Sequence, residues 1–308
     1  MGAEPAAGVR VSADEPAPDH DPVSHDEREL LEVALQAARM AGLLLLERFE
    51  DGVAKDVRSK STPTDLVSEA DLDSQRALRA LLAELRPDDG FLGEEEIGEA
   101  HGAGGGGEAD ALLARDTASS EDDERSALRW IVDPLDGTVN FLFGIPQWCV
   151  SVAVQDQTGS TLAGAVYDAC RDEMWGVSAH GEPTLNGEAV SCSERTELAS
   201  AMVATGLFYD SAVRGRQSEV LAALVPRVRD IRRFGSAALD LTWTAAGRYD
   251  AYFERGVKVW DIAAGALVCE RAGVRLAHLE AVPGEPILPP GLLAAPAPLI
   301  DALLEIVA

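Results

Sequence analysis

The sequence predicts an α/β protein whose N-terminal half is of the α+β type. Apolar residues recur at helical spacing up to about residue 49 and again over about 69–86. Valines alternate with less apolar residues in Cys149–Gln155, and the next segments continue this strand pattern as an antiparallel meander. From about residue 199, strands alternate with helices. Further strands are predicted at 91–93, 129–132, 161–168, 171–178, 201–206, 229–233, 249–254, 274–278 and 291–295, and further helices at 216–225, 237–247, 260–272 and 296–306.

The chain has 308 residues, of which 46% are hydrophobic, and this is enough for two ordinary domains. We expect an N-terminal α+β domain over 25–198 and a C-terminal α/β domain over 199–308, because the pattern of elements changes between them. Residues 1–24 are rich in proline, alanine and acidic residues and are expected to form a disordered acidic tail. Residues 98–127 include four consecutive glycines and are expected to form a flexible insert.

The formal net charge of −27 argues against a nucleic-acid partner, because phosphates are bound by clustered lysine and arginine. The four cysteines form no CxxC pair, which argues against a zinc site or a disulfide framework and for reduced thiols. No basic and apolar leader is evident, and no apolar run is long enough to span a membrane. We therefore expect a cytoplasmic protein without a membrane partner.

The stretch WIVDPLDGTVNF, residues 130–141, is the strongest candidate for chemistry. Asp133 ends an apolar strand, Pro134 cannot continue the strand ladder, and Asp136 is placed to cap a helix that begins at Gly137 and Thr138. The free N–H groups of such a helix start bind anions. Two carboxylates would repel a phosphate there unless a divalent cation, for which Mg²⁺ is suited, lay between them. A capped turn without a metal ion is the alternative that composition alone leaves open.

Three other stretches carry acidic residues in similar settings. Gly93–Glu96 follows a short strand and could equally be a solvated run of charge. Trp260–Gly265 contains Asp261, which could simply be a helix N-cap. Lys60–Asp71 could be a polar hairpin that enters a helix with acidic residues in its first turn.

Together with Gly235–Ala238, these stretches resemble, in this order, the inositol monophosphatase family of metal-dependent phosphatases. The resemblance covers about 27–275, interrupted by the insert. The stretch DPLDGTVNFLFGIPQWCVSVA is most similar to the bacterial inositol-1-phosphatase branch. The resemblance implies a layered αβαβα sandwich of the sugar-phosphatase type, a homodimer, and inhibition by lithium.

The same resemblance implies two to three Mg²⁺ ions, held by the N-terminal domain and by one residue of the C-terminal domain. Glu94, Asp133 and the carbonyl oxygen of Leu135 would hold the first ion. Asp133, Asp136 and Asp261 would hold the second, and a third, weaker ion would share Glu94. All of these side-chain positions are acidic in this sequence.

The remaining implied roles concern the water and the substrate. Thr138, with Glu94 or Asp71 behind it, would orient the attacking water, and the amides of Gly137 and Thr138 would bind the phosphate. The Ala237 amide and Glu254 would contact the substrate. A mobile loop near the metal ions would contain Lys60 and Asp65.

We therefore expect a Mg²⁺-dependent phosphomonoesterase that hydrolyses inositol monophosphate, a small phosphorylated polyol, to inositol and phosphate. Metal ions can activate water directly, so no phospho-enzyme is needed, and the five histidines form no cluster. Histidinol phosphate, a nucleotide 3′-phosphate and a sugar bisphosphate are alternative substrates for the same chemistry. A non-catalytic metal or phosphate binder is a further alternative, which the intact set of acidic positions disfavours.

Overall fold

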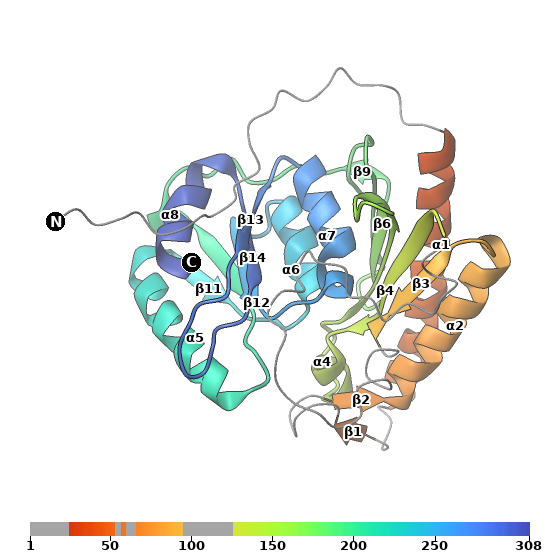
Figure 1. The fold of residues 1–308 in the computed structure, drawn as a ribbon, viewed down its shortest axis with the longest axis horizontal. Coiled ribbons are helices and arrows are strands. Elements are labelled where there is room, and N and C mark those ends of the chain that lie inside the picture. Colours follow the sequence, from red (N-terminus) through yellow and green to blue (C-terminus); the bar gives the residue numbers. More distant parts are fainter. Residues whose placement is uncertain (1–24, 53–56, 60–65, 95–125) are drawn as a thin grey trace.

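Five layers of helix and sheet alternate in the computed structural model of this chain, which describes residues 25–52, 57–59, 66–94 and 126–308 (Figure 1). A seven-stranded and a five-stranded sheet are separated by two helices, and each sheet carries further helices on its outer face. This is the αβαβα sandwich that was expected, and the predicted fold class is confirmed.

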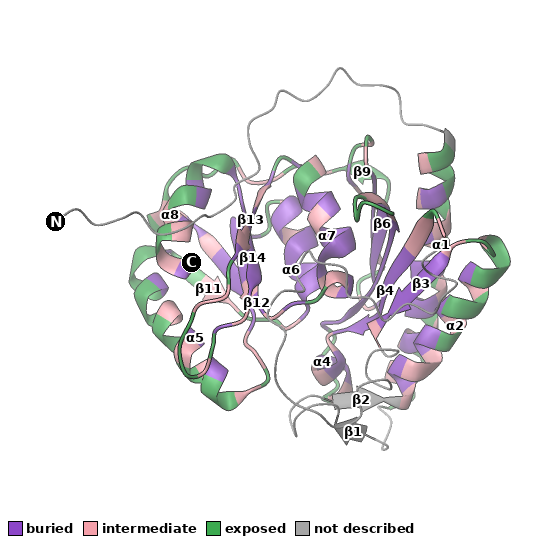
Figure 2. Cartoon of the chain, viewed as in Figure 1, coloured by how far each residue is buried: buried purple, intermediate pink, exposed green. Residues whose placement is uncertain are grey.

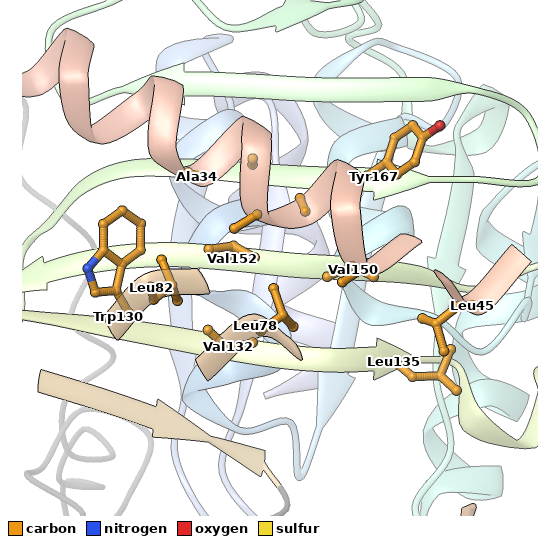
Figure 3. Close-up of a cluster of buried hydrophobic side chains, with 14 of the residues drawn as sticks. Ala34, Leu45, Leu78, Leu82, Trp130, Val132, Leu135, Val150, Val152 and Tyr167 are labelled. Carbon is orange, nitrogen blue, oxygen red and sulfur yellow. The ribbon is translucent and has the colours of Figure 1, made fainter. Parts of the chain in front are cut away.

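The first outer layer consists of α1 (His25–Glu50) and α2 (Glu69–Leu85), which cover one face of the seven-stranded sheet. Their small and branched apolar residues pack on this face because both helices present an apolar stripe to it. Ala34, Leu45, Leu78 and Leu82 point toward side chains of the sheet such as Val150 in Figure 3.

The seven-stranded sheet has the order β3-β4-β5-β6-β7-β8-β9. Its first pair, β3 and β4, is parallel, and the other pairs are antiparallel, which gives the expected meander. The strands are β3 (Gly90–Gly93), β4 (Leu128–Asp136), β5 (Cys149–Asp156), β6 (Thr161–Asp168), β7 (Glu173–Ser178), β8 (Thr184–Leu185) and β9 (Glu188–Ala189).

The central layer consists of α6 (Ala237–Ala245), which is almost wholly buried, and α7 (Val259–Arg271), most of whose residues are buried (Figure 2). Helix α7 packs closely on the first sheet, since a Cβ atom on Gly164 of β6 would lie 2.9 Å from the Cα atom of Ala264. This contact holds the middle of α7 against the central strand of the sheet.

The five-stranded sheet has the order β11-β10-β12-β14-β13, in which β10 pairs in parallel with β11 and β12 while β14 runs antiparallel to its neighbours. Its outer face is covered by α5 (Ser211–Leu224) and α8 (Ala297–Val307). The strands are β10 (Met202–Thr205), β11 (Asp230–Arg232), β12 (Ala251–Arg255), β13 (Arg275–Leu279) and β14 (Gly291–Ala295).

Most predicted elements lie within a few residues of the observed ones, but two boundaries were wrong. Strand β4 was expected to end at residue 132, yet it continues to Asp136 with an irregularity between Asp133 and Asp136 where Pro134 interrupts the ladder. Helix α5 begins at Ser211 rather than 216, because the side chain of Asp210 accepts hydrogen bonds from the N–H groups of Ala212 and Val213.

The remaining expectations on organisation stay predictions. The two sheets end and begin at Ala189 and Met202, on either side of the expected boundary at residue 198, but the division into two domains is not tested by this. The expected tail, 1–24, and nearly all of the expected insert, 98–127, lie outside the described residues. A short antiparallel pair, β1 (Val57–Ser59) and β2 (Leu66–Ser68), lies where a hairpin or loop was expected. Among the helices of the described ranges, none combines the length and apolarity that crossing a bilayer requires.

Candidate active site

Strand β4 carries its residues alternately to its two faces, and this alternation places the first candidate ligand. Trp130 and Val132 pack under α1 and α2, whereas Ile131 packs against residues of α6 and α7. Asp133, two residues beyond Ile131, therefore continues on the α7 side, where its carboxylate is only 2% exposed. Its Oδ1 accepts a hydrogen bond from the Leu135 N–H at 3.0 Å, which fixes the carboxylate at the end of the ladder.

Glu94 follows β3, the parallel neighbour of β4. Because Gly93 pairs with Val132, the register brings Glu94 level with Asp133. The sequence could anticipate this proximity only by assuming that the two strands are neighbours.

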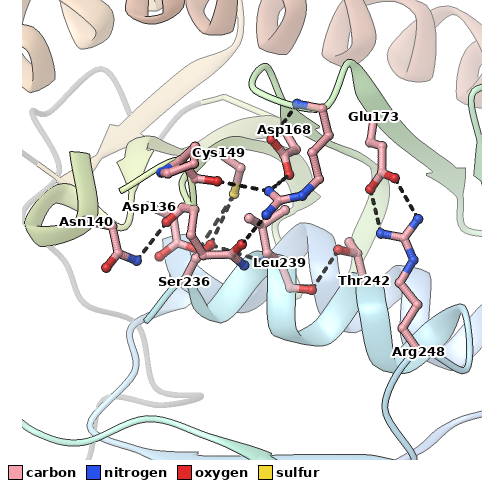
Figure 4. A network of polar contacts seen from close by, with 12 residues as sticks. Asp136, Asn140, Cys149, Asp168, Glu173, Ser236, Leu239, Thr242 and Arg248 are labelled. Atoms are coloured by element: carbon pink, nitrogen blue, oxygen red, sulfur yellow. Dashed lines mark hydrogen bonds and ion pairs between the residues drawn. The ribbon is translucent and has the colours of Figure 1, made fainter. Parts of the chain in front are cut away.

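Asp136 does not cap the helix that follows it, so that expectation was wrong. Helix α4 (Thr138–Leu142) starts without a side-chain cap, after Gly137 in the left-handed region with φ of 98°. Asp136 instead caps α6: its Oδ2 accepts from the Ser236 hydroxyl at 2.7 Å and from the Ala238 N–H at 2.7 Å (Figure 4). The positive end of the α6 dipole favours the carboxylate there, 100 residues away along the chain.

The alternative that Asp261 is the N-cap of its helix is contradicted by the structure. The N-cap of α7 is Lys258, and Asp261 occupies the third helical position, where its Oδ2 accepts the Lys258 N–H at 2.7 Å. The start of α7 is tied to the first sheet by the Ser151 hydroxyl, which donates to the carbonyl oxygen of Trp260 at 3.3 Å. Since Ser151 pairs with Asp133 across β5 and β4, this bond brings Asp261 to the Asp133 end of the sheet.

The three aspartates and Glu94 form one electrostatic cluster. Burial raises the pKa of Asp133 well above its ordinary value, and the charges of Glu94, Asp136 and Asp261 raise it further. Burial, Glu94 and Asp136 likewise raise the pKa of Asp261. Burial raises the pKa of Asp136 to about 6, although its bonds from α6 act in the opposite direction. No ion pair from a described residue offsets the charge of these three aspartates.

The donor set of this cluster suits a hard divalent cation, which prefers oxygen ligands. In each of the three aspartates one oxygen is held by a backbone N–H at 2.7–3.0 Å, and the other makes no hydrogen bond shorter than 3.3 Å within the described ranges. One oxygen is thus anchored and the other is available. The described side chains nevertheless include no group of three or more acids, histidines or cysteines already close enough together to hold a metal ion. The carboxylates would have to move closer together to bind a cation. Their mutual repulsion, which contributes to the raised pKa values, opposes this movement until the cation is bound.

Thr138 lies beside this cluster, at the start of α4. Its hydroxyl oxygen is 2.9 Å from Oδ1 of Asp71 on α2 and 3.0 Å from the carbonyl oxygen of Leu135. Asp71 is fully buried, and the hydroxyl of Ser74, one turn further along α2, donates to the carbonyl oxygen of Pro134 at 2.8 Å. Helix α2 therefore fixes both the backbone at Pro134 and the hydroxyl of Thr138. Of the two carboxylates expected behind Thr138, that of Asp71 lies within hydrogen-bond distance of the hydroxyl.

The expected substrate contacts come from the C-terminal layers. Glu254 lies on β12, its Oε2 accepts the Tyr252 hydroxyl at 3.0 Å, and burial raises its pKa to about 7. A Cβ atom on Gly206 would lie about 1.9–2.0 Å from the Glu254 carboxylate. The Glu254 side chain can therefore take this position only because residue 206 is a glycine. The Ala237 N–H, expected to face the substrate, points toward Oδ1 of Asp136 at 3.3 Å.

Lys60 and Asp65 lie outside the described residues, so nothing further follows for the expected mobile loop. Sequence reasoning missed the supporting roles of Ser74, Ser236 and Gly206. Ser236 stood in a motif that was recognised, but its bond to Asp136 depends on how α6 packs on β4. Ser74 and Gly206 carry no local signal, since a serine in a helix and a glycine after a strand are ordinary.

The five layers, with an acidic cluster where β3, β4 and α7 meet, define a sandwich protein of the sugar-phosphatase type. The sequence profile of the inositol monophosphatase family matches residues 26–305, and the chain belongs to this family of phosphatases.

Individual relatives agree with this assignment. The chain is 44% identical to the inositol-1-monophosphatase of Mycobacterium bovis over 247 residues, which are 79% of this chain and 78% of that protein. The solved structure of Mycobacterium tuberculosis SuhB matches with a TM-score of 0.69 and 34% identity, covering 92% of this chain and 97% of that one. The extragenic suppressor protein suhB of Bartonella henselae matches with a TM-score of 0.73 and 29% identity, covering 90% and 97%.

Proposed function

We propose that this protein is a Mg²⁺-dependent phosphomonoesterase that transfers the phosphoryl group of a small ester directly to water. The observation that carries the proposal is the cluster of Glu94, Asp133, Asp136 and Asp261. Burial and neighbouring acidic charges raise the pKa values of the three aspartates, to which no described residue contributes an ion pair. Three aspartates with raised pKa values are costly to keep for structure alone, because burying charges of the same sign near one another destabilises a fold. A cation-binding role explains why they are present.

The proposed ligands are carboxylate oxygens of these four side chains and the carbonyl oxygen of Leu135, for two to three Mg²⁺ ions. When bound, the ions would neutralise phosphate charge and lower the pKa of the attacking water. The Leu135 carbonyl oxygen already accepts one contact from Thr138, which leaves it one further lone pair.

The chain's own groups would orient the water. When the Thr138 hydroxyl donates to Asp71, its lone pairs are free to accept a hydrogen bond from a water on the side of the cluster. Asp71 can take up the proton that passes through the hydroxyl. The amides at Gly137 and Thr138 are proposed to bind the phosphate.

The proposed substrate is inositol monophosphate. Several relatives carry the name inositol-1-monophosphatase, and Glu254 offers a carboxylate suited to hydroxyl groups, together with the Ala237 amide as a second contact. Histidinol phosphate, a nucleotide 3′-phosphate and a sugar bisphosphate stay as alternative substrates. By the same resemblance we propose a homodimer and inhibition by lithium.

A panel of phosphate esters tests the proposal. Phosphate release with MgCl₂ is expected to be fastest on inositol monophosphate, and to fall by about 10³-fold or more in Asp133→Asn, since such a change removes one ligand shared by two ions. A preference for histidinol phosphate would reassign the substrate but keep the chemistry. Equal inactivity of the wild type and the variant toward every ester would instead favour a non-catalytic binder.

A further inference from the structure

The side chain of Asn140 joins three segments behind the candidate site. Asn140 lies on α4, is 7% exposed, and belongs to the same turn as Asp136. Its Nδ2 donates to the carbonyl oxygen of Phe234 at 2.6 Å and to that of Gln147 at 2.8 Å. A longer contact from the same nitrogen reaches the carbonyl oxygen of Gly235 at 3.4 Å, so both of its hydrogens are engaged.

The first bond holds the segment that leads into α6. Phe234 and Gly235 immediately precede Ser236, the N-cap of α6, and Gly235 adopts a φ of 85° that favours glycine. Asp136 accepts from Ser236 and Ala238 on the other side of this turn. Both ends of the segment 136–140 thus bond to the start of α6. Asp136 accepts hydrogen bonds from it, and Asn140 donates one to the residues just before it.

The second bond holds the segment behind Gly137. The carbonyl oxygen of Gln147 would lie 2.9 Å from a Cβ atom on Gly137, so the two backbones are in close contact. The side chain of Gln147 is fixed as well, because its Oε1 accepts from Arg171, which also binds Asp168. Asn140 is therefore anchored to the loop before β5, which is itself held by Arg171 and its ion pair with Asp168.

We propose that Asn140 is a positioning residue, which keeps the N–H groups of α6 aligned on Asp136 and so sets where Oδ1 of that carboxylate points. It touches neither the proposed substrate nor the proposed ions. The part of the inference that concerns cation affinity rests on the proposed function, whereas the alignment of α6 does not.

The test substitutes Asn140→Asp in the full chain, which keeps the shape but turns an oxygen toward two carbonyl oxygens. Asn140→Ala is the second variant, because it removes the donors without adding charge. The matched control is Asn186→Asp: the Asn186 amide also donates to a backbone carbonyl, that of Asp172 at 2.9 Å, but in the distant turn between β8 and β9.

Amide hydrogen exchange without divalent cations is the first readout. Exchange at residues 236–239 is expected to accelerate about tenfold or more in both Asn140 variants and to stay unchanged in the control, while β5 keeps its protection in all of them. Unchanged exchange at 236–239 in both Asn140 variants would overturn the inference. So would acceleration spread equally over 236–239 and β5, since that would indicate global destabilisation.

Calorimetric titration with MgCl₂ alone is the second readout. The Asn140 variants are expected to bind Mg²⁺ about 10–100-fold more weakly than the wild type, the usual effect of losing support behind a ligand. If the wild type binds and the Asn140 variants bind as tightly, Asn140 does not position Asp136 for the cation. If the wild type itself binds no Mg²⁺, the proposed function fails, while local acceleration of exchange still supports the alignment of α6 by Asn140.

Discussion

The hydroxyl of Thr138 lies 2.9 Å from a carboxylate oxygen of Asp71, across the contact between α4 and α2. The two residues are 67 positions apart in the sequence, and both are buried. A hydroxyl has a single hydrogen, so Asp71 and the carbonyl oxygen of Leu135 compete for it. The proposed role of Thr138 in orienting water requires the hydrogen to go to Asp71, so Thr138 is the most direct residue to test.

Thr138→Val removes the hydroxyl and keeps the shape of the side chain. We expect kcat to fall by roughly 10²-fold while KM changes little, because the lost contact acts on the water rather than on the ester. Thr138→Ser, which retains a hydroxyl, is expected to keep activity within about tenfold. Steady-state kinetics at saturating MgCl₂ measures both, and equal losses in the two variants would contradict this role.

Removing a carboxylate from the acidic cluster is expected to stabilise the fold when divalent cations are absent. The pKa of Asp133 is raised by burial and by its acidic neighbours, so its ionised form destabilises the folded state above that pKa. Asp133→Asn should therefore raise the free energy of unfolding at pH 8 in EDTA by about 1 kcal/mol or more. Urea denaturation with and without MgCl₂ measures this, and added MgCl₂ should stabilise the wild type but not the variant.

The charge of Glu254 should make stability depend on pH in a defined window. Its pKa is about 7 in the folded protein and 4.5 ordinarily, so the folded state keeps a proton that the unfolded state loses between these values. Stability contributed by this group is present below about pH 4.5 and is lost as the pH rises through about 7. Glu254→Gln should be more stable than the wild type by on the order of 2 kcal/mol at pH 8, and by less at pH 5.5. Denaturation in EDTA at the two pH values measures this; a constant difference would contradict it.

Gly206→Ala should displace Glu254 without unfolding the protein. A Cβ atom there would overlap the Glu254 carboxylate, which is the end of a flexible side chain and can move away. We expect KM for a polyol phosphate to rise about tenfold, equivalent to about 1.4 kcal/mol, with calorimetric affinity for Mg²⁺ unchanged. Gly215→Ala in α5 is the control, since a Cβ atom there meets nothing within 4 Å. An unchanged KM in Gly206→Ala would argue against Glu254 as a substrate contact.

The elements of the fold could be predicted from the sequence because each leaves a local pattern. The valine alternation of β5 reflects layers packed on both of its faces, and the helical spacing of α1 reflects the one sheet that it covers. Both patterns therefore indicate the layers even before the partners are known. The extension of β4 through Pro134 could not be predicted, because the pairing with β5 overrides the usual effect of proline on a strand.

The sequence by itself determined which residues are acidic, where the strands and helices lie, and which family the motifs resemble. Only the tertiary structure decided what each acidic residue does with its oxygens. Asp136 and Asp261 each look like the cap of the helix nearest in sequence, yet Asp136 caps α6, and Asp261 folds back onto its own helix start. The physical reason is that a carboxylate binds whichever N–H groups come within about 3 Å, and the packing of layers far apart in the sequence decides which ones do.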